Sequence, residues 1–264
     1  MDEVKFEWAR MTWAEVRDRM HQDPKPVVLI PVGSVEEHGQ QTPVGADYLA
    51  ADYVARKTAE ATQSLALPPV CYGYAESFRG FPGTISLRPS TVYAILYDLC
   101  ENVLRHGVDH VVIVNNHGGN QPLVEQVAWE VRKRFGIVLA SLYPWRMARY
   151  PDLFPDASVF GHGAEPVASV MSYLTPGDMR MDLARPDRWQ PYEGLNMESA
   201  TSARLGKWTV GMFVGLREIS ETGTTGDPTG ATPERGGAIV ERIVQYCIDF
   251  VNQFKRMRTR LEGV

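Results

Sequence analysis

The chain has 264 residues, of which 44% are hydrophobic and 22% charged, and this composition is ordinary for a globular protein with one large α/β domain. Its formal net charge is −5, and its one basic cluster follows the last predicted helix, where we interpret it as a solvated helix end. No apolar run approaches the roughly 18 residues that a membrane span needs, so we expect neither nucleic acid nor a membrane as a partner.

The cysteines and the N-terminal residues indicate the cellular compartment. Cys71, Cys100 and Cys247 lie far apart and form no C-x-x-C pair, which is typical of free thiols in a reducing environment. The first stretch of the chain is charged throughout and has no apolar segment of the kind found in signal peptides. We therefore expect a cytoplasmic protein.

Short apolar strands alternate with amphipathic helices along most of the chain. Thr12 and Glu15 have the spacing of a capping box at the start of the first helix. The elements predicted next are, in chain order, strand 26–33, helix 46–61, strand 65–73, helix 90–107, strand 110–116, helix 118–136, strand 137–145 and helix 163–174. This alternation predicts one α/β domain over residues 1–264 with a mainly parallel sheet.

The last third of the chain has a less regular pattern. Residues 175–204 contain several prolines and give no clear periodicity, whereas residues 209–215 and 217–220 are predicted to be late strands of a hairpin. The last predicted helix covers residues 232–254, with Thr232 as its N-cap and a proline at its first position.

Polar side chains gather at the ends of the predicted strands and at the start of a helix. Glu36 and His38 follow the first strand, His117 follows the strand 110–116, and Glu165 lies near the start of a later helix. Ligands of open α/β sheets bind at the carboxyl ends of strands, and imidazole with carboxylate suits zinc, manganese or iron. Glu36 and His38 leave an extended segment on the same side, and Asp47 has two oxygens with which to bridge two ions. The sequence therefore predicts a metal site.

Each of these residues also has a simpler structural interpretation. Asp47 stands at a helix start and is equally explained as a helix cap, and His117 as a hydrogen-bonded histidine in a turn. An acid such as Glu165 is favoured in a first helical turn by the helix dipole. Glu37 points away from its neighbours, so we expect it to be solvated or to lie behind a ligand, and Asn120 is expected to cap the following helix. The joint occurrence favours the metal site.

Five segments of the sequence resemble the creatininase (creatinine amidohydrolase) family. "GSVEEHGQQTPVGAD" resembles the signature G-S-x-E-Q-H-G-x-H-L-P-x-x-x-D, and "NNHGGN" resembles N-G-H-G-G-N. "FPGTISL" matches a segment between them, "GHGAEPVAS" resembles H-A-G-E-x-E-T-S, and "TGTTGDPTGATPERG" resembles the late motif of the family. The matches occur in order and span nearly the whole chain.

The resemblance implies a metal-dependent amidohydrolase with a three-layer α/β/α fold and a mainly parallel central sheet. It also implies a compact homo-oligomer, with a hexamer favoured, and a small-molecule amide as substrate. Two divalent ions are implied, zinc or manganese with iron as a further possibility. The metal ligands that carry over by position are Glu36, His38, Asp47, His117 and, as the fifth, Glu165.

The chain departs from the family pattern at several positions. Creatininase itself has a glutamate two residues after the motif histidine, where this chain has Gly119, and the prediction of Glu165 as the fifth ligand follows from that difference. The family glutamine between the first two ligands is Glu37, and its second histidine is Gln41. These changes leave the ligand set intact but predict a substrate other than creatinine.

The predicted reaction is cleavage of the C–N bond of a small, cyclic amide by a metal-activated water. His162 is the predicted proton donor to the leaving nitrogen, since imidazole titrates near neutral pH, and Glu37 is the second candidate. Trp145 is predicted to cover a flat substrate, with core packing as an equal alternative. Ser77, which lies just before the F-P-G-T segment, is a second predicted substrate contact.

Two rival functions remain open. One is a mononuclear metal hydrolase, in which Glu165 is only a helix-start acid. The other is a non-catalytic small-molecule-binding protein on the same fold, which the altered third motif permits. A redox enzyme and a serine hydrolase are disfavoured because the sequence has no G-x-G-x-x-G after a strand and no G-x-S-x-G.

Overall fold

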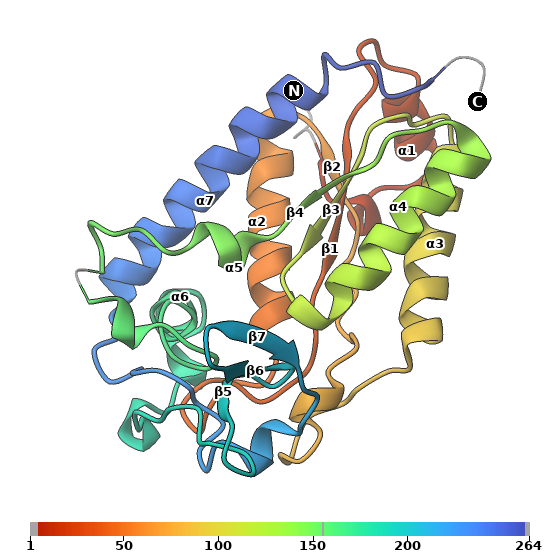
Figure 1. Cartoon of the computed structure of the whole chain (residues 1–264). Helices are drawn as coiled ribbons and strands as arrows, with labels where there is room; N and C mark the ends of the chain where they lie inside the picture. The colour runs from red at the N-terminus through yellow and green to blue at the C-terminus, as the bar shows by residue number, and fades with distance from the viewer. Residues whose placement is uncertain (1–4, 155, 262–264) are drawn as a thin grey trace.

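The computed structural model describes residues 5–154 and 156–261 and is built around a parallel sheet of four strands (Figure 1). The strand order is β2-β1-β3-β4, and every neighbouring pair is parallel. The longest pairing joins β1 to β3, in register from Val28 opposite Val111 to Val32 opposite Asn115. The strands are β1 (Val28–Val32), β2 (Leu65–Ala66), β3 (Val111–Asn115) and β4 (Ala140–Leu142).

Helices cover both faces of this sheet, as Figure 1 shows. One face packs against α1 (Trp13–Met20), α3 (Pro89–Arg105) and α4 (Gln121–Phe135). The other face packs against α2 (Ala46–Thr62), α6 (Val167–Leu174) and α7 (Pro233–Phe254). The fold is thus the three-layer α/β/α sandwich with a mainly parallel sheet that the resemblance implies.

The central strand β1 shows why its sequence does not alternate between apolar and polar residues. All five of its residues are buried. Val28 and Ile30 belong to the core beneath α3 and α4, whereas Leu29 belongs to the core beneath α2 and α7. A strand that is covered on both faces needs apolar side chains at every position.

The predicted helix starts are confirmed at both ends of the chain. Thr12 Oγ1 accepts from the amide of Glu15, and the Glu15 carboxylate accepts from the amide of Thr12 at 2.6 Å, so the capping box is complete. Thr232 Oγ1 accepts from the amide of Arg235, one turn into α7. Each bond satisfies an amide that has no partner inside its helix.

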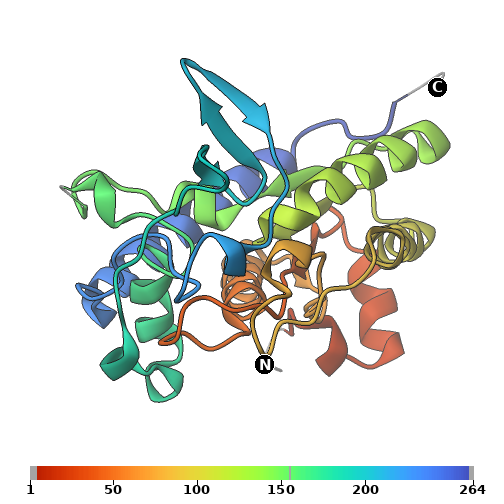
Figure 2. The ribbon, with the colours of Figure 1, turned by 60° about the horizontal axis from the view of Figure 1, so that its bottom comes forward.

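A second, antiparallel sheet lies beyond the carboxyl ends of the parallel strands. It consists of β5 (Asn196–Ser199), β6 (Ser202–Leu205) and β7 (Trp208–Gly211) in that order. Figure 2 shows its strands projecting from the body of the molecule. Strands β5 and β6 were not predicted, because their short, polar sequences show no apolar alternation.

The prediction of a strand over residues 217–220 is wrong. Leu216–Glu218 forms a turn of 3-10 helix, and Leu216 and Ile219 are both buried in a small core with Met197. Two apolar residues three apart face the same side of a tight helical turn, which places Leu216 and Ile219 together in this core.

Other boundaries also differ from the predictions. The strand predicted over residues 65–73 is only Leu65–Ala66, and the strand predicted over residues 209–215 is Trp208–Gly211. The fourth strand is shorter than predicted, because Pro144–Met147 forms the short helix α5 after it. Helix α6 begins only at Val167, since Gly163 has a φ of 64°, which a right-handed helix does not accept. The remaining short turns of 3-10 helix are Trp8–Arg10, Glu76–Phe78, Gly118–Asn120, Ala157–Val159, Pro176–Asp178 and Met181–Leu183. Within the described ranges, no helix has the length and apolar character to cross a membrane.

Candidate active site

Four predicted ligands come together where β1 and β3 end. Glu36 and His38 lie on the loop after β1, Asp47 is in the first turn of α2, and His117 follows β3. Their side chains are at most 4% exposed. His117 Nδ1 lies 3.0 Å from Glu36 Oε2 and 3.1 Å from Asp47 Oδ2, and His38 Nε2 lies 3.3 Å from Asp47 Oδ1. The sheet therefore gathers residues that are up to 81 positions apart, as between Glu36 and His117.

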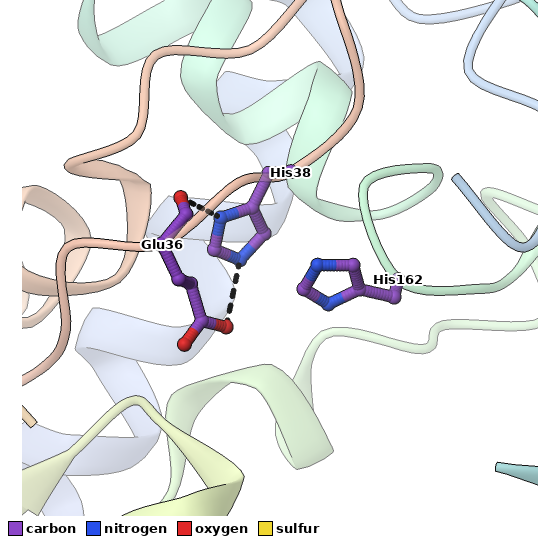
Figure 3. A group of neighbouring side chains, drawn as sticks. All are labelled: Glu36, His38 and His162. Carbon is purple, nitrogen blue, oxygen red and sulfur yellow. Dashed lines mark hydrogen bonds and ion pairs between the residues drawn. The ribbon is translucent and has the colours of Figure 1, made fainter. Parts of the chain in front are cut away.

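Figure 3 shows how Glu36 and His38 face one another, with His162 beside them. His38 Nε2 is 3.8 Å from Glu36 Oε1, and its Nδ1 is 3.3 Å from the backbone oxygen of Glu36. The rings of His38 and His162 are stacked, with 4.5 Å between their centroids. Potential ligand atoms of these three residues lie within 4.8 Å of one another, as do those of Glu36, Asp47 and His117.

Asp47 is held by donors on both of its oxygens. Ser34 Oγ donates to Oδ2 at 2.7 Å, and Trp145 Nε1 donates to Oδ1 at 2.7 Å. No side-chain bond caps the start of α2, so the alternative of Asp47 as a helix cap does not apply. The carboxylate is instead oriented toward His38 and His117.

His117 is oriented by a backbone contact on the far side of its ring. Its Nε2 is 2.7 Å from the carbonyl oxygen of Tyr74, to which it donates, so Nδ1 is left to face the two carboxylates. Gly119 makes this contact possible, because a Cβ there would overlap the Tyr74 oxygen and crowd the His117 ring. Asn120 does not cap the next helix as predicted; its amide bridges the amide of Tyr74 and the carbonyl of Gly33.

The electrostatics of this cluster fit a cation. Burial by itself lowers the pKa of His38, but the carboxylates of Asp47 and Glu36 outweigh burial and raise that pKa to about 9. The pKa of His117 is raised for the same reason, and that of Asp47 is lowered by the two histidines against the effect of its own burial. Among the described residues, buried Glu36 Oε2 has no partner in hydrogen-bond geometry, although His117 Nδ1 lies 3.0 Å from it. Buried carboxylates crowded with imidazoles form a donor set that suits divalent zinc or manganese.

His162 and Glu37 form a pair next to the cluster. His162 Nε2 lies 3.0 Å from Glu37 Oε1 and 2.7 Å from the Glu37 carbonyl oxygen. Glu37 is 5% exposed, so of the two predictions for it, solvation is wrong and a place behind the ligands agrees with its position. Phe78 stacks on the outer face of the His162 ring at 4.3 Å, a contact that nothing in the sequence indicated.

Glu165 is not brought into this cluster. Its Oε1 accepts from Ser169 Oγ at 2.7 Å and from Arg235 Nη1 at 2.9 Å, so it ties α6 to α7. Burial raises the pKa of Glu165 despite these donors. Arg235 lies 70 positions later in the chain, so its contact with Glu165 has no local sequence signal. In this structure Glu165 links α6 to α7, and its role as a metal ligand stays a prediction.

A cleft of about 1230 Å³ opens over the cluster. Trp145 and Ser77, the predicted substrate contacts, both line it, and Trp145 also binds Asp47 and packs against the core. The antiparallel sheet supplies part of one wall through residues 198–201 and the segment 213–215 after it. Lining residues that the sequence analysis did not single out include Phe78, Tyr143, Arg149, Phe160, Trp189 and Phe213.

Comparison with known proteins places this site in a family. The family model described as creatininase, creatinine amidohydrolase, matches residues 9–251. The chain belongs to the creatininase family. Its fold matches a crystal structure of creatinine amidohydrolase (creatininase) with a TM-score of 0.80 at 23% identity, covering 97% of this chain and all of the other. A solved structure described as manganese creatininase also has a TM-score of 0.80.

Two curated members of the creatininase family differ in the substrates that their names state. A mycofactocin precursor peptide peptidase of Mycolicibacterium smegmatis is 30% identical, over 89% of this chain and 88% of its own. A creatinine amidohydrolase of Pseudomonas putida is 25% identical, over 92% of this chain and 95% of its own. Membership thus establishes an amidohydrolase family, and the names of the two relatives state different substrates, a precursor peptide and creatinine.

Proposed function

We propose that this protein is a metal-dependent amidohydrolase that hydrolyses the C–N bond of an amide at the cluster of Glu36, His38, Asp47 and His117. The observation that carries the proposal is the burial of these acids and imidazoles together at the floor of an open cleft. A set of costly polar groups at most 3% exposed is retained most simply because it binds cations. We propose two divalent ions, zinc or manganese, with iron as a further candidate, because relatives' structures are described as zinc and manganese forms.

The residues around the cluster have separate proposed roles. Ions held by the cluster would supply Lewis-acid chemistry, lowering the pKa of water and polarising an amide carbonyl. His162 lies on the cleft wall beside His38 and donates the proton to the leaving nitrogen. Glu37 orients His162 through the 3.0 Å contact, and Trp145 fixes Asp47 while lining the cleft.

The substrate we propose is larger than a single heterocycle. A cleft of about 1230 Å³ exceeds the range of roughly 300–1,000 Å³ that holds drug-sized ligands. The relative named as a peptidase supports a peptide-like amide as the substrate. The small cyclic amide predicted from the sequence is the competing candidate.

Metal content and hydrolysis test this function together. Protein purified without chelator should contain two equivalents of metal by mass spectrometry. It should also hydrolyse members of a panel of peptides and cyclic amides, giving two fragments from a peptide and a single ring-opened product from a cyclic amide. His117→Ala should lose metal and activity, whereas His106→Ala, an exposed histidine outside the cluster, should keep both. Glu165→Gln should keep its metal, because its carboxylate already pairs with Arg235 and Ser169.

The other outcomes separate the rival functions. One equivalent of metal in the wild type would support the mononuclear hydrolase. A loss of metal in Glu165→Gln would restore Glu165 as a ligand. No metal after addition of zinc or manganese, together with no hydrolysis, would leave the non-catalytic binding protein.

A further inference from the structure

The cleft contains one strong cation that pairs with no carboxylate among the described residues. Of the residues that line it, Arg149 is the only arginine or lysine. Its side chain is exposed, and within the described ranges it makes no hydrogen bond or ion pair. Its guanidinium lies 5.0 Å over the ring of Phe160, two residues before His162. An aromatic face restrains a guanidinium while leaving its N–H edges free to bind a ligand.

The acids at the rim of the cleft do not neutralise Arg149. Glu76 is paired with Arg79 at 2.9 Å, and Glu198 is paired with Arg204 and accepts from Thr209 Oγ1. Both acids therefore have their own cations. The acids at the floor, Glu36 and Asp47, face the histidines of the cluster instead. The wall that Arg149 occupies is thus left positive.

We propose that Arg149 binds a carboxylate of the substrate, so that the protein acts on amides that carry a free carboxyl group, such as N-acylated amino acids and peptides. This inference rests on the proposed amidohydrolase function. A guanidinium presents a planar fork of donors that matches a carboxylate in bidentate fashion, with charge-assisted bonds stronger than neutral ones. Arg149 would therefore decide which amides are held over the metal cluster, without taking part in bond cleavage.

Two probes that differ only in the carboxylate test this role. N-acetyl-L-alanyl-L-alanine and its C-terminal amide are titrated into the metal-containing protein by calorimetry. We expect the acid to bind about tenfold more tightly than the amide, because a charge-assisted pair contributes on this order. Arg149→Gln should abolish the preference, and Arg149→Lys should retain part of it.

Arg146→Gln is the matched control. Arg146 is also exposed and lies 5.1 Å over an aromatic ring, that of Tyr143, but it does not line the cleft. It should bind both probes as the wild type does. If the wild type binds acid and amide equally, the proposal is overturned.

A preference for the acid that survives Arg149→Gln would also overturn the proposal, since the carboxylate would then be bound by the metal ions. Hydrolysis is followed separately, by release of alanine or its amide. Absence of hydrolysis with an intact, Arg149-dependent preference would count against the proposed function alone. The two failures are therefore distinguishable.

Discussion

At the scale of single residues, Gly119 controls the geometry of His117. The imidazole is fixed by its 2.7 Å bond to the Tyr74 carbonyl, and that carbonyl occupies the space that a Cβ at position 119 would need. Creatininase itself has a glutamate at this position by the sequence resemblance. In this chain the backbone of Tyr74 leaves no room for such a side chain, so a ligand from position 119 is incompatible with this arrangement.

Gly119→Ala should therefore destabilise the protein by about 1–3 kcal/mol, as overpacking of a tight site does. It should also lower metal content, because the new methyl group displaces either Tyr74 or the His117 ring. The control is Gly177→Ala, where a Cβ meets nothing within 4 Å. Urea unfolding and metal analysis of both variants check the expectation. Wild-type stability and metal content in Gly119→Ala would show that the Tyr74 backbone yields easily.

At the scale of elements, Asp187 anchors the loop of residues 220–225, which contacts His162. Asp187 Oδ2 accepts from Ser220 Oγ at 2.8 Å, from the amide of Glu221 at 3.1 Å, and from the amide and hydroxyl of Thr222. Farther along this loop, Thr225 Oγ1 accepts from the amide of His162 at 2.8 Å. The residues that donate to Asp187 Oδ2 lie 33 to 35 positions later in the sequence.

The stability that Asp187 supplies should depend on pH. Burial raises the pKa of Asp187, but the amide of Arg188 and the donors of Ser220 and Thr222 outweigh it and lower the pKa below its usual 3.8. A carboxyl group with a lowered pKa in the folded protein stabilises it fully above the unfolded value and loses that effect as the pH falls. Asp187→Asn should therefore cost about 1–2 kcal/mol at neutral pH, and less as the pH falls below 3.8.

Urea unfolding of wild type and Asp187→Asn across this pH range measures the difference. Asp178→Asn serves as the control, since the Asp178 side chain makes no hydrogen bond within the described ranges and should change little at any pH. If Asp187→Asn lowers the free energy of unfolding by the same amount at every pH, the ionised carboxylate of Asp187 is not the form that the loop binds.

At the scale of the whole molecule, a single chain exposes several large apolar side chains. Trp129 on α4 is 69% exposed, Trp208 on β7 is 68% exposed, and Phe213 beside the cleft is 83% exposed. Such residues are scattered on many monomers, but large aromatic side chains this exposed also suit contacts between subunits. The homo-oligomer predicted from the family resemblance would bury such side chains if they lie at its interfaces.

We expect the protein in solution to have six times the 29.5 kDa mass of one chain. Light scattering coupled to size exclusion measures this mass, and a dilution series shows whether the assembly is stable. A mass of one chain at every concentration would contradict the prediction. A mass of two to five chains would confirm that the chain associates with itself but would contradict the hexamer.

The sequence by itself determined the layered fold and predicted the four polar residues that meet at the edge of the sheet. Uninterrupted apolar runs such as Val28–Val32 require cover on both faces, and parallel strands so covered bring their carboxyl ends together. The apolar pattern of each strand can be read from the sequence of that strand alone, and it repeats along the chain. This pattern, with the polar residues that follow the strands, was sufficient to predict that Glu36, His38, Asp47 and His117 would meet.

Only the tertiary structure decided which partners the other polar residues have. Glu165 reads as a ligand in its motif, yet its carboxylate meets Arg235 from another helix. Glu37 was expected to be solvated or to lie behind a ligand, and a loop around Gly223 buries it next to His162. The acids at the rim of the cleft that contains Arg149 have cations of their own. The spacing of apolar residues along the sequence indicates which face of a helix or strand is buried. The partner of a charged side chain depends instead on contacts between distant segments, which no local pattern predicts.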